Sequence, residues 1–182
     1  RRSGPLVIDI MVNAGAIRRD HWLQDRESGG GRIVGEGCHF IDLARHFAGA
    51  PIRGLQVISA RGTDAAIDDV ATIQLAFADG SLASIRYLAN GHKGFPKERV
   101  ELFFDGKAIR IDNFRKLEAW GIDGLATRLP QRQDKGHEAL AAAFVRAVRD
   151  GGASPIPVEE LLEVSEWSIR AQELASSGGG EA

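Results

Sequence analysis

The sequence predicts an α+β domain in which an open, mainly antiparallel β-sheet carries helices on one face. Two turn sequences, Asp79-Gly80 and Asp105-Gly106, each separate two apolar-rich runs. Both residue types tolerate a positive φ, so each turn is typical of a β-hairpin. Two long helix-forming segments follow the hairpins. Strands in hairpins followed by helices favour an α+β class, and 182 residues suffice for one such domain.

The first part of the chain predicts a strand, a connection and a helix. Leu6–Asn13 is rich in β-branched and aliphatic residues, as strands are. Residues 14–30 form a long connection that runs into the glycine turn Gly29–Gly31. Ile33–Ala48 then carries apolar residues at helical spacing and is followed by Gly49, a common helix terminator.

The middle of the chain predicts six strands. The alternation is plainest in the second of these strands, where Ala71, Ile73, Leu75 and Phe77 share one face. The six predicted strands are Leu55–Arg61, Val70–Ala78, Leu82–Ala89, Arg99–Phe104, Lys107–Asp112 and Lys116–Trp120.

Two helices are expected to close the domain after an irregular segment over residues 121–134. Lys135–Arg149 is rich in alanine and is stopped by Gly151-Gly152. Glu159–Ala175 starts just after Pro157. We therefore expect a domain over residues 1–175 and a flexible tail over residues 176–182, whose sequence is SSGGGEA.

Composition excludes several classes of protein. The formal net charge is −2, so there is no global basic field of the kind that attracts nucleic acid. No apolar run approaches the ~20 residues that a membrane-spanning helix needs. The single cysteine, Cys38, cannot form an intrachain disulfide and suits a reducing compartment. These features favour a cytoplasmic protein that binds neither nucleic acid nor membranes.

A dinucleotide-binding turn is missing from the sequence. Such a turn needs Gly-x-Gly-x-x-Gly between a strand and a helix. The segments that begin at Gly29 and at Gly35 both lack the last glycine. The domain alone is therefore not expected to bind NAD or NADP tightly.

The predicted helix that starts at Ile33 carries Glu36, His39 and Asp42 three residues apart, near one face. Glycines at positions 35 and 37 cost about 1 kcal/mol each in a helix. One interpretation is a site where a ligand approaches the helix backbone. The other is a closely packed helix with His39 as a hydrogen-bonded core residue. The Glu-x-x-His spacing also suits a metal ligand pair, but it occurs once and no second pair accompanies it, so we expect no metal.

Several short motifs together resemble the C-terminal domain of the glucose-fructose oxidoreductase, inositol dehydrogenase and MocA (Gfo/Idh/MocA) family. The resemblance covers nearly the whole chain. The motifs are the triple glycine before His39 and Asp42, the Asp79-Gly80-Ser81 turn, Tyr87–Asn90 with Lys93–Glu98, and Ile111–Arg115. The resemblance implies an open sheet of the dihydrodipicolinate reductase-like or glyceraldehyde-3-phosphate dehydrogenase-like C-terminal type.

The resemblance also implies a function. Members are oxidoreductases that use NAD or NADP and act on sugar-like secondary alcohols. An N-terminal Rossmann domain, absent from this sequence, supplies the cofactor site and usually a catalytic lysine. The first helix of the C-terminal domain lies against the nicotinamide, and the open sheet makes homo-oligomer contacts. The 182 residues alone are accordingly expected to be inactive.

The resemblance assigns roles to the residues of the first helix. The family pattern there is Asp-x-Gly-x-His-x-x-Asp, and Gly37, His39 and Asp42 match it. The resemblance makes His39 the catalytic base and Asp42 a substrate-binding residue. Gly35 stands at the first Asp position, so the usual carboxylate partner of the histidine is absent. Glu36 is the neighbouring candidate for that carboxylate and hence a second candidate catalytic residue, but on an ideal helix it points about 100° away.

Three further side chains are candidates for binding substrate. Lys97 follows Pro96, which restrains the backbone, and its ammonium can bind a hydroxyl or a carboxylate. Asn90 shares that loop. Trp22 offers a ring that can stack on a sugar face. Each also has an ordinary interpretation, as a solvated cation, a loop amide or loop packing.

Two other functions remain open at this point. One is an enzyme that recycles its NAD while it cleaves or epimerises a sugar. The other is a non-catalytic binding module whose exposed sheet serves assembly. The glycine at position 35 favours these two over a dehydrogenase to a small degree.

Overall fold

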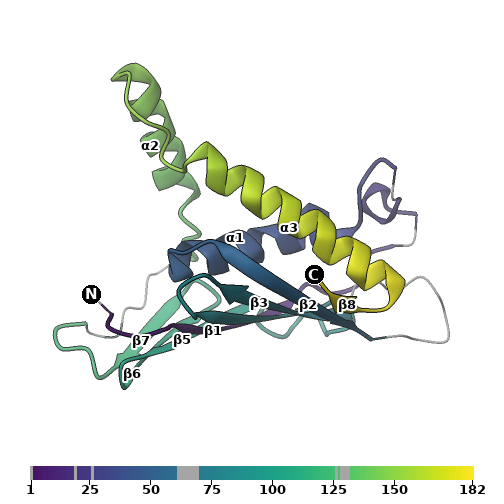
Figure 1. Cartoon of the computed structure of the whole chain (residues 1–182), viewed down its shortest axis with the longest axis horizontal. Coiled ribbons are helices and arrows are strands. Elements are labelled where there is room, and N and C mark those ends of the chain that lie inside the picture. Colours follow the sequence, from purple (N-terminus) through teal and green to yellow (C-terminus); the bar gives the residue numbers. More distant parts are fainter. Residues whose placement is uncertain (1, 19, 26, 61–69, 126, 128–131) are drawn as a thin grey trace.

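Strands that alternate apolar and polar residues form an open eight-stranded sheet in the computed structural model of the chain (Figure 1). The structure describes all residues except 1, 19, 26, 61–69, 126 and 128–131. The strands are β1 (Val7–Asn13), β2 (Ile52–Ser59), β3 (Val70–Phe77), β4 (Leu82–Leu88), β5 (Glu98–Phe104), β6 (Lys107–Asp112), β7 (Lys116–Trp120) and β8 (Gly180–Glu181). Their order across the sheet is β7-β6-β5-β1-β4-β3-β2-β8.

Strand β1 joins two antiparallel parts of the sheet. It pairs parallel with β4, with Val7 opposite Leu82, and antiparallel with β5, with Val7 opposite Phe103. The other pairs are antiparallel, and the two Asp-Gly turns connect β3 to β4 and β5 to β6. The prediction of an open, mainly antiparallel sheet is confirmed.

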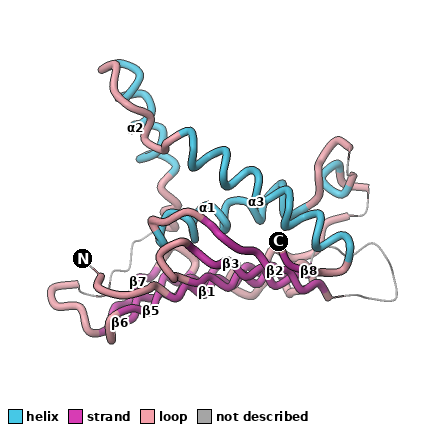
Figure 2. The backbone as a smooth tube through the Cα atoms, viewed as in Figure 1, coloured by secondary structure: helices cyan, strands magenta, loops and turns pink. Residues whose placement is uncertain are grey.

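Helices cover one side of the sheet (Figures 1 and 2). They are a short 3-10 turn η1 (Trp22–Gln24), a π-helical turn η2 (Ile33–Gly37), α1 (Cys38–Ala48), α2 (His137–Arg149) and α3 (Val158–Ser177). α1 buries Phe40, Ile41 and Ala44, and α3 buries Val164 and Ala171. These side chains meet the inward residues of the strands in one core cluster. α2 buries no residue and projects away from the sheet.

A carboxylate on α3 links this helix to α1 and to the start of β2. Glu163 Oε2 accepts a hydrogen bond from Arg45 Nε at 3.0 Å, and its Oε1 accepts one from the backbone N–H of Ile52 at 2.5 Å. Arg45 is only 7% exposed. Because removal of one partner leaves the other charge buried, this pair fixes how α3 lies against α1 and the start of β2.

The structure differs from the sequence prediction at two places. The predicted helix from Ile33 to Ala48 begins as the π-helical turn η2, not as an α-helix. The segment expected to be a flexible tail is ordered into the last residues of α3 and into β8, which pairs with β2. Gly178 and Gly179 have φ of about 100°, so they reverse the chain, and Ala182 exchanges two backbone hydrogen bonds of 2.8 Å with Leu55.

The remaining strands and helices lie within three residues of their predicted ends. Arg61, the last residue of one predicted strand, lies outside the described residues, as do residues 126 and 128–131 of the segment predicted to be irregular. In the part of the chain that the structure describes, no helix combines the length and the apolar character needed to cross a membrane.

Two isoleucines of the sheet provide a matched test of this fold. Ile10 on β1 is fully buried, whereas Ile58 on β2 is 63% exposed. Ile10→Ala should lower the free energy of unfolding by about 2–5 kcal/mol, because it removes buried methyl groups and leaves a cavity. Ile58→Ala should change it by less than about 0.5 kcal/mol. Urea unfolding followed by circular dichroism measures both, and equal losses would contradict the assigned faces of the sheet.

Candidate functional site

Three chain segments meet at one end of the sheet because of the pairing of β1. The carboxyl end of β1 lies beside the carboxyl end of β4, with Asn13 opposite Leu88. It also lies beside the start of β5, with Val12 opposite Glu98. The connection after β1 and the loop after β4 therefore gather at this end, and hydrogen bonds of Arg32 and Glu36 join the turn η2 to them. Most of the predicted site residues belong to these segments.

Glu36 on η2 is the centre of a hydrogen-bonded cluster. Its Oε1 accepts from Lys97 Nζ at 2.5 Å. Its Oε2 accepts from the Tyr87 hydroxyl at 2.5 Å and from Arg32 Nη2 at 3.2 Å. Tyr87 is fully buried and Arg32 is 3% exposed, whereas the Lys97 side chain is 41% exposed. The carboxylate thus joins two buried donors to one ammonium that solvent can reach.

Arg32 ties the same cluster to the connection after β1. Its Nη1 donates to the carbonyl of Gly15 at 2.7 Å. Its guanidinium lies over the ring of Tyr87, 5.3 Å from the centroid, which is a cation–π geometry. A buried arginine with these partners holds Glu36 and Tyr87 in fixed positions.

The charge state of Glu36 follows from these contacts. Burial raises the pKa of Glu36, but hydrogen bonds from Lys97, Tyr87 and Arg32 outweigh it, and the pKa lies below its usual value. A carboxylate held ionised by three donors is a weak proton acceptor. The hydrogen bonds of Glu36 go to Lys97, Tyr87 and Arg32, and its catalytic role beside His39 stays a prediction.

His39 and Asp42 lie on α1, next to this cluster in the chain. His39 is exposed in the first turn of the helix, and Asp42 is half-buried. Burial raises the pKa of Asp42, and the negative charge of Glu160 adds to it, while His46, His39 and Arg45 oppose the shift. His39 thus presents an imidazole to solvent, and the alternative of a buried core histidine does not describe it.

Asn13 holds the loop that carries Lys97. Its backbone N–H donates to the Lys97 carbonyl at 2.7 Å, and its Nδ2 donates to the carbonyls of His92 and Phe95 at 2.9 and 3.2 Å. A Cβ at residue 91 would lie 1.8 Å from Asn13 Oδ1, so only glycine fits there. The sequence analysis missed Asn13, Arg32 and the hydroxyl of Tyr87. The available signals were an asparagine at the end of a predicted strand and the place of Tyr87 in one of the motifs that carry the family resemblance.

Trp22 and Asn90 remain outside the cluster. Trp22 is 62% exposed on η1 and its ring lies 5.9 Å from that of His21. Asn90 is exposed at the end of β4. No hydrogen bond among the described residues joins either side chain to Glu36 or Lys97.

The glycines before α1 lie where the backbone has a positive φ or where a neighbouring side chain comes close. Gly30 and Gly31 have φ of 71° and 91°. A Cβ on Gly31 would lie 2.4 Å from the side-chain oxygen of Gln172, which accepts a hydrogen bond from the N–H of Ile33. A Cβ on Gly35 would lie 2.2 Å from Leu23 Cδ1. Leu23 therefore fills the space next to Gly35, where a side chain at that position would begin.

Metal-ligating side chains do not gather in the described part of the chain: no three His, Cys, Asp or Glu residues there are placed to hold an ion. The side chains that the site does offer are an exposed imidazole, an ammonium paired with a carboxylate, and a half-buried carboxyl. Such a set can bind hydroxyl groups and transfer a proton.

Comparison with known proteins identifies similar folds. Residues 7–110 match the GFO/IDH/MocA C-terminal domain. By sequence the chain matches none of the curated proteins. Its fold is similar to that of UDP-N-acetylglucosamine 3-dehydrogenase from Acidithiobacillus ferrooxidans, with a TM-score of 0.73 and 14% identity over 96% of this chain and 55% of that one.

Two further solved structures are similar. One is an aldose-aldose oxidoreductase from Caulobacter crescentus complexed with glycerol, with a TM-score of 0.73 and 17% identity over 98% of this chain and 56% of that one. The other is an oxidoreductase from Agrobacterium radiobacter in complex with NAD+, L-tartaric acid and magnesium, with a TM-score of 0.68 and 20% identity over the same shares. The chain spans about half the length of these relatives, and at these identities the likeness shows the fold.

Glu36→Gln tests the cluster through its dependence on pH. Because the folded pKa of Glu36 lies below its usual 4.5, the carboxylate stabilises the fold above pH 4.5. That stabilisation is lost as the pH falls through the lowered folded pKa. At pH 7 the substitution should cost about 1–3 kcal/mol. The cost should shrink as the pH falls below 4.5.

Urea unfolding of both chains at pH 7 and at acid pH measures the difference. Glu138→Gln, at an exposed position on α2, is the matched control and should have no effect at either pH. A cost for Glu36→Gln that is the same at both pH values would contradict an ionised, hydrogen-bonded Glu36.

Proposed function

Because the chain belongs to the GFO/IDH/MocA C-terminal domain family, whose model matches more than half of it, we propose that it is the substrate-binding and catalytic part of an NAD- or NADP-dependent oxidoreductase. Its substrate is a sugar-like secondary alcohol. A nucleotide-binding domain outside these 182 residues completes the enzyme, and the 182 residues alone are inactive. The location of the enzyme is the cytoplasm.

The observation that carries this proposal is the exposed imidazole of His39 at the start of α1, next to the turn η2 on which Glu36 accepts a hydrogen bond from Lys97. Hydride loss from an alcohol requires the hydroxyl proton to leave as the carbonyl forms. His39 takes that proton in oxidation and returns it in reduction, since histidine is the side chain that most often serves as a general acid and base. Lys97 donates to a substrate oxygen, and Glu36 holds its ammonium in place. Asp42, Asn90 and Trp22 form the outer part of the substrate site.

The bound cofactor supplies the hydride acceptor. The described residues offer no glycine-rich turn between a strand and a helix for a pyrophosphate, so the cofactor is bound mainly by the other domain. Three similar proteins support the proposal: one is a dehydrogenase of a nucleotide sugar, one is an aldose-aldose oxidoreductase, and one is an oxidoreductase in complex with NAD+.

His39→Ala in the complete enzyme should lower kcat by about 10²–10⁴-fold, the usual contribution of a positioned proton acceptor. Cofactor affinity and thermal stability should stay near wild type, because the side chain is exposed. His46→Ala is the matched control, since His46 is also exposed on α1. Steady-state kinetics with the substrate and fluorescence titration with NADH measure these effects. Wild-type kcat in His39→Ala would refute the role of His39.

A second part of the proposal concerns self-association through the open face of the sheet. The strand register aligns one row of apolar residues across seven strands of this face, next to a row of polar and charged residues. The apolar row is Trp120, Ala108, Phe103, Val7, Leu82, Ala76 and Gly54. The large residues of this row are each 45–53% exposed, and they are Trp120, Phe103, Val7 and Leu82. A row of this kind favours a partner surface that removes it from water.

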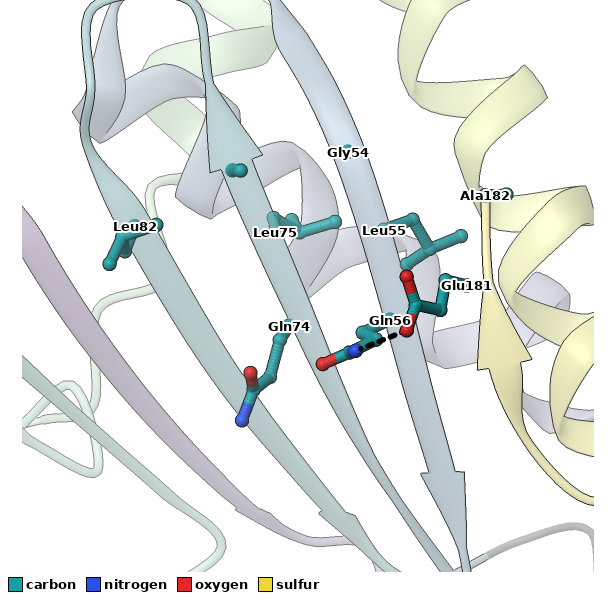
Figure 3. Close-up of a pocket in the computed structure, with 9 residues that line it drawn as sticks. Gly54, Leu55, Gln56, Gln74, Leu75, Leu82, Glu181 and Ala182 are labelled. Atoms are coloured by element: carbon teal, nitrogen blue, oxygen red, sulfur yellow. Dashed lines mark hydrogen bonds between the residues drawn. The ribbon is translucent and has the colours of Figure 1, made fainter.

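The side chains at the two ends of the apolar row differ in size. Its β7 end carries the large ring of Trp120. Its other end, at Ala76 and Gly54, borders a shallow hollow of about 510 Å³ (Figure 3). Gln56 and Glu181 line the same hollow and are hydrogen-bonded at 3.0 Å. A two-fold axis along β1 would place the large end of one protomer over the hollow of its partner. We therefore infer a homodimer contact with this axis.

Leu82→Glu tests the dimer contact, because it places a carboxylate in the apolar row. It should weaken self-association by at least about tenfold, since burial of a leucine side chain is worth about 1.5–3 kcal/mol. Sedimentation equilibrium over a range of concentrations measures the association. Ile169→Glu, at an exposed position on α3, should leave it unchanged. The contact is wrong if wild type is monomeric throughout, or if both variants associate equally.

A further inference from the structure

Helix α2 stands apart from the rest of the domain. None of its 13 residues is buried, and both views show it projecting away from the sheet and from α1 (Figures 1 and 2). A helix of this length is marginal in water by itself, and helices in proteins gain most of their stability by packing an apolar face. Such a helix needs a surface to pack against.

α2 has an apolar face suited to packing. Leu140, Phe144 and Val148 follow one another at intervals of four residues and so form one stripe, with Val145 beside it. These four side chains are 51–68% exposed. Arg146 lies on the opposite, polar side of the helix. The face is therefore continuous, apolar and open.

The relatives contain a body of chain that is available to cover this face. The alignments to the three solved structures named above extend over 96–98% of the present chain, yet roughly 45% of each relative lies outside them. Under the proposed function, that remainder corresponds to a nucleotide-binding domain. A domain of such a size is large enough to contact both α1 and α2.

The side from which a nucleotide-binding domain would reach His39 is also the side on which α2 projects. α1, which carries the exposed His39, lies on the same side of the sheet as α2 (Figure 1). The eight-stranded sheet separates the opposite face from His39. A domain that brings a cofactor to His39 must therefore approach from the side on which α2 projects.

We propose that the face formed by Leu140, Phe144, Val145 and Val148 is the docking surface for the nucleotide-binding domain, which presents an apolar patch to it. This inference rests on the proposed function. In this arrangement α2 forms part of the interface between the two domains. The position of the cofactor relative to His39 then depends on a helix that takes no part in the chemistry.

Hydrogen exchange followed by mass spectrometry tests the docking. The two samples are the complete polypeptide and the 182-residue chain, each at two concentrations. The amides of residues 140–148 should exchange at least about tenfold more slowly in the complete polypeptide, at both concentrations. The double variant Leu140→Glu/Phe144→Glu should abolish this protection. Ala142→Glu, at an exposed position on the polar side of α2, should leave it intact.

Two results would overturn the proposal. One is equal exchange of α2 in both samples. The other is protection in the 182-residue chain that increases with concentration, which would make a second copy the partner. Titration of the complete polypeptide with NADH separates this test from the proposed function. A wild-type polypeptide that binds neither NADH nor NADPH refutes the proposed function, whereas cofactor binding with an unprotected α2 refutes the docking alone.

Discussion

The position of β1 between β4 and β5 is the constraint on which the rest of the structure depends. Its inward side chains Ile8, Ile10 and Val12 are fully buried. Without β1, the sheet would separate into a β5–β7 part and a β2–β4 part, because no other strand among the described residues connects them. The same pairing brings the end of β4 and the start of β5 to one edge. One strand therefore both completes the core and assembles the site.

Much of the sheet was predictable because the sequence patterns of its strands and turns each lie within a short segment of the chain. Alternation places Ala71, Ile73 and Leu75 on one face, and an Asp-Gly turn both ends a strand and starts the next. The partner of β1 was not predictable, since a periodic pattern does not say which strand lies beside it. The ordered C-terminus was missed for a different reason: three glycines favour both a flexible tail and a tight reversal, and the pairing partner of β8 lies more than 120 residues earlier in the sequence.

The candidate site was predictable only in part. His39 and Asp42 follow from a motif within one helix, and the structure keeps His39 exposed. The contact of Glu36 with Lys97 joins residues 61 positions apart and leaves no local signal. Residues 33–37 are wound as the π-helical turn η2, so the angle of an ideal α-helix does not apply to Glu36. Tertiary contacts thus decide the hydrogen-bond partners of this carboxylate.

The burial of Tyr87 has a spectroscopic consequence. It is the one tyrosine in the chain, and its hydroxyl donates to Glu36 within the candidate site. All tyrosine ultraviolet absorption and all tyrosine ring resonances in nuclear magnetic resonance spectra of this chain therefore come from a single group beside that carboxylate. Tyr87 is therefore a natural spectroscopic probe that needs no label. It reports any ligand or proton that disturbs the contact between Glu36 and Lys97.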